Sequence, residues 1–267
     1  MTHVSEDELL DVMHELRTAG TPFVVATVIG ARGSTPRKAG AKMVVAGDGR
    51  SFGTVGGGAV EAKVHERARA VLACPAVDRF TWELGSSEAG GMVCGGTMEF
   101  LLEPFGARPP AFVFGGGHVG KALSRALVEL RFDVTVVDDR EALLTEERLP
   151  GVRLVTAAPR TAAAELALPP SAFAVVVTRG HAQDLDTLRS LVRKDLRYLG
   201  LMGSRKKKIE IFDALRAEGV SDEVLARVHC PVGLDIGAES PEEIAVAIAA
   251  EMIVTLRAKP ALGSDKA

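Results

Sequence analysis

The stretch of the sequence best suited to hold a phosphate is a glycine-rich turn at residues 114 to 120, FGGGHVG. It follows a short apolar run and opens a stretch with helical periodicity, so backbone amides and the positive end of the helix dipole would face an anion. Gly115 suits the tight turn, Gly117 lets the backbone approach a ligand, and Gly120 lets helix and strand pack closely. The predicted binding turn consists of Gly115, Gly116, Gly117, His118, Val119 and Gly120.

The G-x-G-x-x-G spacing of this turn is typical of dinucleotide binding, but the ligand stays open between a nicotinamide cofactor and another phosphorylated molecule. Asp138 ends the next apolar run, where it could accept hydrogen bonds from a ribose or a heterocycle. The alternative is a surface carboxylate beside Arg140. His118 would either touch the ligand or face solvent at the start of a helix.

Two further polar loops follow later apolar runs and should reach the same edge of the sheet. TRGHAQDLDTL comes directly after the fourth run and GSRKKK after the fifth. Asp184 would either orient His181 or simply sit at a helix N-terminus, and the lysine-rich stretch could be a solvated face. Because open sheets bind ligands at the carboxyl ends of their strands, we add six residues to the predicted site: Arg179, Gly180, His181, Gly203, Ser204 and Arg205.

The first hundred residues carry weaker candidates. Arg32 and Arg37 lie on a nonhelical basic loop that could contact an anion, and Gly57 and Gly58 precede a helix and could cradle a phosphate or simply turn the chain. Cys94 stands among glycines, where it would be either an exposed thiolate and metal ligand or a buried inert side chain. We identify no catalytic constellation and no other metal ligand.

Composition excludes several classes of protein. The 267 residues carry 32 basic and 35 acidic side chains, a net charge of −3, which indicates no broad attraction to nucleic acid or to a membrane surface. The acidic N-terminus does not resemble a signal peptide, and no apolar run reaches the length of a membrane span. We therefore expect a soluble, cytoplasmic protein. Its three cysteines are far apart and predict neither disulfides nor a structural zinc site.

The elements that would position these residues fall into two groups, which the length and the 47% apolar content also favour. We expect domains at 1–105 and 110–267, with a Pro- and Gly-rich linker at about 103–110. The first group indicates a smaller α+β domain, because strands dominate it. Its expected elements are helices from Ser5 to Gly20 and over 59–73, and strands over 23–30, 42–47, 51–56, 78–84 and 96–104.

The second group alternates nearly unbroken apolar runs with helical or alanine-rich stretches. This pattern predicts an α/β domain with a Rossmann-like parallel sheet and helices on both faces. Ser240, Pro241 and Glu243 supply the N-cap, first-turn proline and capping-box glutamate of a closing helix. The expected strands lie at 111–114, 133–138, 152–156, 172–178 and 197–203.

Taken together, these segments resemble the XdhC/CoxI family, the xanthine dehydrogenase accessory factors. The resemblance runs almost the length of the chain and depends on the order and spacing of several stretches, each weak alone. Some relatives have a cysteine after the first glycine triplet, where this chain has Ala59, so a thiol role at that position is in doubt. The stretches are GSTPRKAGAKMVV, GTVGGGAVEAKV, CGGTMEFLLEP, FGGGHVGKAL with VVDDR, TRGHAQDLDTL, YLGLMGSRKKK and GLDIGAESPEEIAVAIAAEMI.

The resemblance implies a carrier and not a turnover enzyme. Such a protein binds the molybdenum cofactor, supports its sulfuration by a cysteine desulfurase, and delivers it to an apo molybdenum hydroxylase of the xanthine dehydrogenase type. Molybdopterin ends in a phosphate, which suits the turn at Gly115 to Gly120. Two alternatives use the same turn: an NAD(P)-dependent oxidoreductase with His181 as general acid, and a regulatory protein that senses a nucleotide. A homodimer is compatible with the sequence.

Overall fold

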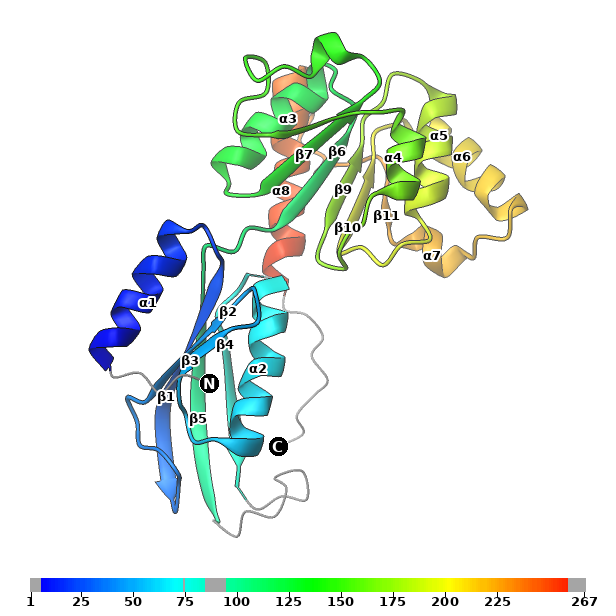
Figure 1. The fold of residues 1–267 in the computed structure, drawn as a ribbon. Coiled ribbons are helices and arrows are strands. Elements are labelled where there is room, and N and C mark those ends of the chain that lie inside the picture. The colour runs from blue at the N-terminus through cyan, green and yellow to red at the C-terminus, as the bar shows by residue number, and fades with distance from the viewer. Residues whose placement is uncertain (1–5, 74, 85–94, 259–267) are drawn as a thin grey trace. The chain divides into compact units, whose positions relative to one another are not determined.

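The chain divides into two compact units, Met1–Ala107 and Arg108–Ala267, in a computed structural model that describes residues 6–73, 75–84 and 95–258 (Figure 1). Each unit has its own sheet and its own apolar core. Strand β5 (Gly96–Phe105) and strand β6 (Pro110–Phe114) extend into the stretch expected to be a linker. Phe105 still pairs with Phe23 and stacks on its ring, which explains why β5 continues so far.

The N-terminal unit is built on a five-stranded sheet in the order β3-β2-β1-β5-β4. All of its pairings are antiparallel. The Asp48-Gly49 turn joins the second and third strands, and Gly49 has the positive φ of +90° that such a turn requires. The other strands are β1 (Phe23–Gly33), β2 (Lys42–Ala46), β3 (Ser51–Gly53) and β4 (Asp78–Glu83).

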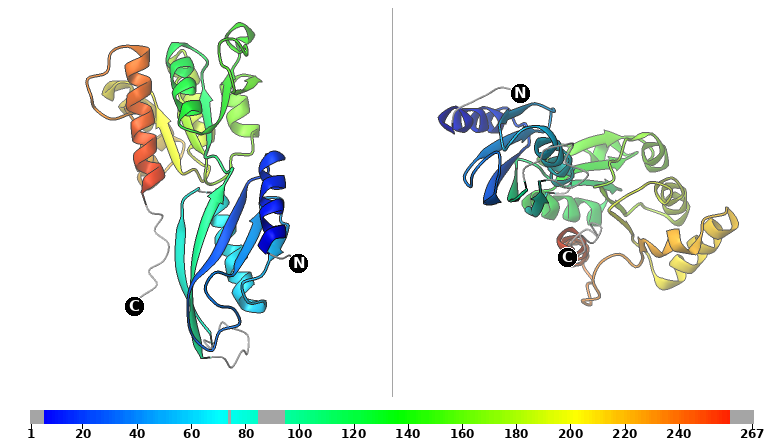
Figure 2. Two further views of the ribbon diagram at one scale, coloured as in Figure 1. Left: turned by 90° about the vertical axis from the view of Figure 1, so that its left-hand side faces the viewer. Right: turned by 90° about the horizontal axis from the view of Figure 1, so that it is seen from below.

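Both faces of this sheet are covered by helices, which is why the first four residues of strand β1, Phe23 to Ala26, are all buried. Val24 and Ala26 point into the cluster shared with α2 (Gly58–Ala73), whereas Phe23 and Val25 pack with side chains of α1 (Glu6–Thr18). Figure 1 shows the two helices on opposite sides of the strands, and Figure 2 gives two further views of the same unit. The alternation of side-chain direction along a strand thus buries both faces of β1.

The C-terminal unit is a six-stranded parallel sheet in the order β11-β10-β9-β6-β7-β8. Helices α3 (His118–Glu129) and α8 (Pro241–Arg257) pack on one face, and α4 (Pro159–Glu165), α5 (His181–Leu191), α6 (Arg205–Ala217) and α7 (Asp222–Ala226) on the other. The predicted α/β fold class is confirmed. The remaining elements are β7 (Asp133–Asp138), η2 (Glu141–Leu143), β8 (Arg153–Thr156), β9 (Phe173–Val176), β10 (Tyr198–Leu201) and β11 (Val228–His229).

The order of strands creates a switch point beside β6. From β6 the chain proceeds to β7 and β8 on one side, and then returns to β9 on the other side of β6. The loops after β6 and β9 therefore diverge, and such a place is where open parallel sheets bind ligands.

The last helix begins as the sequence predicts. Ser240 and Glu243 form a capping box, in which the Ser240 side chain accepts a hydrogen bond from the Glu243 amide at 3.2 Å.

Among the described residues, no helix combines the length and the apolar character needed to cross a membrane.

Candidate functional site

Two glycines of the turn after β6 are required by packing. Gly115 has φ +124°, and a Cβ atom built on it would lie 2.3 Å from the Val177 carbonyl oxygen of the neighbouring strand's loop. A Cβ on Gly120 would lie 1.8 Å from the Gly115 carbonyl oxygen. Helix α3 therefore packs so closely on the preceding turn that only glycine, which has no Cβ atom, fits at these two positions.

Gly117 and Gly180 are different, because open space lies above them. They are the N-cap residues of α3 and α5, and an added Cβ would meet nothing within 4 Å at either position. No side chain caps either helix in the described part of the chain. Since β6 and β9 are paired neighbours, two helix N-termini with open space above them flank the switch point. This arrangement can bind an anion through backbone amides.

Asp138 lies at the end of β7 and holds the turn in place. Its carboxylate accepts hydrogen bonds from the Gly116 amide at 2.7 Å and from the Arg140 amide, Nε and Nη2 at 2.9, 2.8 and 2.8 Å. The residue is 2% exposed. Its acceptor positions are thus used inside the protein, and Asp138 is neither the surface carboxylate nor the ligand-facing acceptor that the sequence suggests.

The environment of Asp138 also sets its titration. Burial alone would raise the pKa of the carboxyl group, but the hydrogen bonds from Arg140 and from the Gly116 amide outweigh burial and lower the pKa to about 2. The charged form is therefore stabilised in the folded protein relative to the unfolded chain, in which an aspartate has a pKa of about 3.9.

Replacement of Asp138 by asparagine is expected to destabilise the protein at neutral pH by on the order of 2 kcal/mol, because the lowered pKa makes the carboxylate a net stabilising group. Since the folded pKa lies below the unfolded one, this contribution is present above about pH 4 and is lost as the pH falls toward 2. Denaturant unfolding of both proteins across this range should show converging stabilities. A gap that persists unchanged at acid pH would contradict this account.

The loops after β7 and β9 are joined by an exposed ion pair. Arg179 Nη2 lies 3.0 Å from Asp139 Oδ2. His181, the first residue of α5, is also exposed, and its Nδ1 lies 3.5 Å from Glu210 Oε2 of α6. His118, the first residue of α3, is exposed, while Val119 is partly buried against the core. Asp139 was not among the residues predicted from the sequence, because its partner Arg179 lies 40 positions away.

A buried polar cluster lies beneath these loops. Asp184 is 1% exposed and accepts a hydrogen bond from Thr178 Oγ1 at 2.6 Å. Its other carboxylate oxygen forms an ion pair with Lys207 Nζ, and Lys207 also donates to the Met202 carbonyl oxygen at 3.2 Å. These hydrogen bonds tie α5 to the loops after β9 and β10. The hypothesis that Asp184 orients His181 gains no support from them.

The third predicted loop, after β10, begins α6. Ser204 is the N-cap residue, as its position in the sequence predicts, and its hydroxyl accepts a hydrogen bond from the Lys207 amide at 3.2 Å. A Cβ on Gly203 would lie 2.8 Å from the Lys207 side chain. Arg205 is exposed at the first position of the helix. Because Ser204 already caps α6, this helix offers an anion less than α3 and α5 do.

In the N-terminal unit the glycine triplet is held by a carboxylate of the protein itself. Glu61 is 1% exposed, and its Oε1 accepts hydrogen bonds from the Gly57 amide at 3.0 Å and from Thr54 Oγ1 at 2.5 Å. A phosphate cradle at Gly57 and Gly58 would place two anions together, so the structure disfavours that interpretation. Arg32 and Arg37 are exposed, and Cys94 lies outside the described residues.

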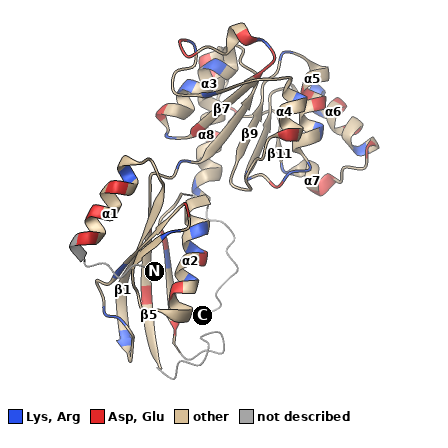
Figure 3. Ribbon diagram, in the orientation of Figure 1, with Lys and Arg blue, Asp and Glu red and all other residues tan. Residues whose placement is uncertain are grey.

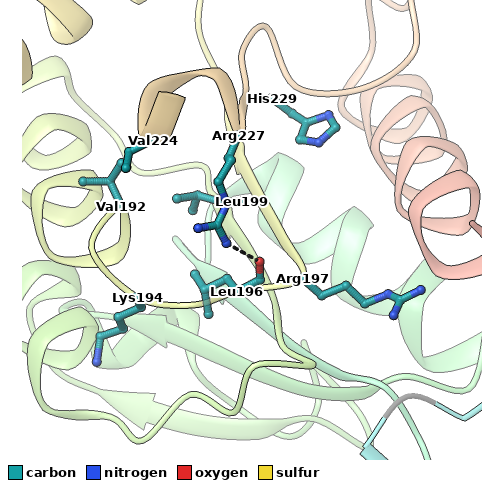
Figure 4. A pocket seen from close by; sticks show the side chains of 8 residues that line it. All are labelled: Val192, Lys194, Leu196, Arg197, Leu199, Val224, Arg227 and His229. Atoms are coloured by element: carbon teal, nitrogen blue, oxygen red, sulfur yellow. Dashed lines mark hydrogen bonds between the residues drawn. The ribbon is translucent and has the colours of Figure 1, made fainter. Parts of the chain in front are cut away.

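A cavity of about 210 Å³ lies at the opposite edge of the C-terminal sheet (Figure 4). Its lining includes Val192, Leu196 and Arg227 from the segments that precede β10 and β11, and Leu199 and His229 of the two strands themselves. Arg227 Nη2 donates to the Leu196 carbonyl oxygen at 3.1 Å and so closes one side of it. The cavity is therefore separate from the glycine turn.

Charged side chains of the described residues do not gather on one part of either unit. Basic and acidic residues are interspersed over both units (Figure 3). The described residues contain no group of three or more histidine, cysteine, aspartate or glutamate side chains that could hold a metal ion. The backbone amides at the starts of α3 and α5, together with the exposed Arg179, can bind an anion.

A parallel sheet with a glycine turn at its switch point is the architecture of Rossmann-type ligand-binding domains. The chain itself belongs to the XdhC/CoxI family: residues 112–252 match the XdhC Rossmann domain, and residues 16–80 match the model of the XdhC and CoxI family. The resemblance seen in the sequence is confirmed. Members of this family are related to xanthine dehydrogenase accessory factors.

Two curated relatives and one solved structure are similar to this chain. The uncharacterized protein YqeB of Escherichia coli (strain K12) is 37% identical over 243 residues, which are 90% of this chain and 44% of YqeB. A protein of Bacillus subtilis (strain 168) that is named as a probable xanthine dehydrogenase subunit is 31% identical over 160 residues, or 60% of this chain and 46% of that protein. The chain thus spans less than half the length of these relatives.

The solved structure is described as a xanthine dehydrogenase from Bacillus halodurans. It covers 96% of this chain and 98% of its own, with a TM-score of 0.54 and 21% identity. At this identity the likeness concerns the fold, and it extends over both units.

Proposed function

We propose that this protein is an accessory factor that carries the molybdenum cofactor. It binds the cofactor as cargo, supports exchange of a terminal oxo ligand for sulfur by a cysteine desulfurase, and delivers the cargo to an apo molybdenum hydroxylase of the xanthine dehydrogenase type. Family membership supports this proposal. The structural observation that carries it is the open space above Gly117 and Gly180 at the switch point.

The site suits the phosphate end of such a cargo. Molybdopterin ends in a phosphate, and the first turns of α3 and α5 carry backbone amides without intrahelical partners beside the open space at Gly117 and Gly180. Arg179 adds a cation beside them. In this proposal Gly116 to Gly120, Arg179 and His181 form the binding region, and Gly203 to Arg205 extend it along the edge of the sheet.

The oxidoreductase alternative fits the geometry less well. A dinucleotide-binding site uses the acidic residue after the second strand to bind a ribose hydroxyl. Here that residue, Asp138, already accepts four hydrogen bonds from Gly116 and Arg140. Oxidation of NADH with an aldehyde or ketone substrate, or a large thermal shift with NAD(P) or another nucleotide, would reverse this ranking.

The decisive test places a side chain into the open space above the turn. Gly117→Leu is expected to reduce retention of molybdenum cofactor at least tenfold, because the leucine would occupy the volume that the phosphate needs. Molybdenum and pterin retained after gel filtration would be measured. Gly117→Ala should give an intermediate loss, and thermal unfolding of both variants serves as the folding control. Wild-type retention in a folded Gly117→Leu protein would remove the turn from the binding site.

A further inference from the structure

The Asp139–Arg179 ion pair lies across the end of the strand that carries the glycine turn. Asp139 follows β7 and Arg179 follows β9, and β6 lies between these two strands in the sheet. Strands two places apart are separated by about 10 Å. The two side chains nevertheless meet, with 3.0 Å between Nη2 and Oδ2. The pair therefore spans the carboxyl end of β6, where the turn begins.

The pair is also free to exchange partners. The side chains of Arg179 and Asp139 are 51% and 32% exposed, and ion pairs in contact with water stabilise a fold little. The guanidinium of Arg140 is already held by two hydrogen bonds to Asp138, and its Nε lies 4.0 Å from Asp139 Oδ1. Gln183 Nε2 is 3.5 Å from Asp139 Oδ2. Arg179 is thus the cation that can leave Asp139 at the smallest cost.

We propose that Asp139 pairs with Arg179 while no ligand is bound, and that Asp139 competes with the ligand for the guanidinium of Arg179. When an anion with a phosphoryl group enters the open space above Gly117, Arg179 exchanges the Asp139 carboxylate for the phosphoryl oxygens. Asp139 then weakens the binding of every anion and lets only a ligand with sufficient charge displace it. For the molybdenum cofactor as ligand, the inference rests on the proposed function.

A positioning role for Asp139 makes the opposite prediction. If the carboxylate served to aim Arg179 at the ligand, its removal would weaken binding. If it competes, its removal frees the guanidinium and also removes a negative charge from the neighbourhood of the bound anion, so binding becomes tighter. The direction of the change in affinity therefore distinguishes the two roles.

The experiment compares the dissociation constants of four full-length proteins: wild type, Asp139→Asn, Arg179→Gln and the double variant. The probes are the molybdenum cofactor and inorganic pyrophosphate, measured by titration at fixed ionic strength. Asp139→Asn should bind both probes about three- to tenfold more tightly, and Arg179→Gln about tenfold more weakly. In the Arg179→Gln background, Asp139→Asn should give a much smaller gain.

A matched control comes from the other edge of the same sheet. Asp195 and Arg227 form an exposed ion pair of similar length, 3.2 Å, before β10 and β11. Asp195→Asn removes the same charge from the same unit and should leave both dissociation constants unchanged. Tightening of equal size in Asp195→Asn would show that only net charge matters, and would overturn the proposal.

The two probes separate this inference from the proposed function. Cofactor binding that does not tighten in Asp139→Asn, or that weakens, refutes the competition while the carrier function stands. Pyrophosphate binding that tightens in Asp139→Asn, in a protein that does not bind the cofactor, supports the competition and refutes the carrier function.

Discussion

Gly120→Ala is expected to destabilise the C-terminal unit by about 3 kcal/mol or more, because the new methyl group would lie 1.8 Å from the Gly115 carbonyl oxygen. That oxygen belongs to the backbone of the turn, so a rotamer change in a side chain cannot relieve the overlap. The helix or the turn must move, and both are packed against the sheet. Chemical denaturation of the intact protein would measure the loss.

Two other glycines of the turn provide the comparison. Gly115→Ala should also be severe, since its Cβ would lie 2.3 Å from the Val177 carbonyl oxygen and its φ is +124°. Gly117→Ala should cost only a few tenths of a kcal/mol, because the helix loses a favourable N-cap residue but meets no obstacle. Equal stability of Gly120→Ala and Gly117→Ala would show that helix α3 does not pack closely on its turn in solution.

The second large effect is expected at the buried ion pair below the loops. Asp184→Leu should destabilise the protein by about 3 kcal/mol, because the buried Thr178 and the partly buried Lys207 lose their carboxylate partner. Lys207→Met should cost a similar amount, because it leaves the carboxylate of a residue that is 1% exposed without its cation.

A double-mutant cycle tests whether this cost comes from the unpaired charge. The Asp184→Leu/Lys207→Met protein should be more stable than the sum of the two single changes implies, because it buries no charge at that position. The unfolding free energies of all four proteins, from denaturant titration, complete the cycle. Strict additivity would mean that the two side chains do not interact in solution.

Most strands of both sheets could be predicted from the sequence, because the burial of a strand leaves a pattern in consecutive residues. Buried parallel strands are nearly continuous apolar runs, so 133–138 was delimited correctly as β7. The capping box at Ser240 was equally visible. Strand β11 was not predicted, because two residues at a sheet edge leave no periodic pattern. The linker was expected to be longer, because Pro and Gly content does not reveal the pairing of Phe105 with Phe23.

The candidate site was predictable in outline and not in its contacts. The rule that ligands meet the carboxyl ends of strands identified three loops, and the structure places all three at one edge of the sheet. The direction of individual side chains depends on partners distant in the chain. Asp138 turns inward to Gly116, 22 positions away, and Asp184 binds Lys207, 23 positions away. Neither partner could be inferred from spacing alone.

If the protein carries the molybdenum cofactor as proposed, the hydrogen bond from the Gly116 amide to Asp138 has a consequence for the transfer of that cofactor. A turn whose shape is already fixed loses little conformational entropy when a molecule arrives, and it regains little when the molecule departs. The free energy of cofactor binding and release would then depend mainly on the contacts between the cofactor and the protein. A recipient enzyme with a higher affinity could therefore accept the cofactor without any conformational change in the turn.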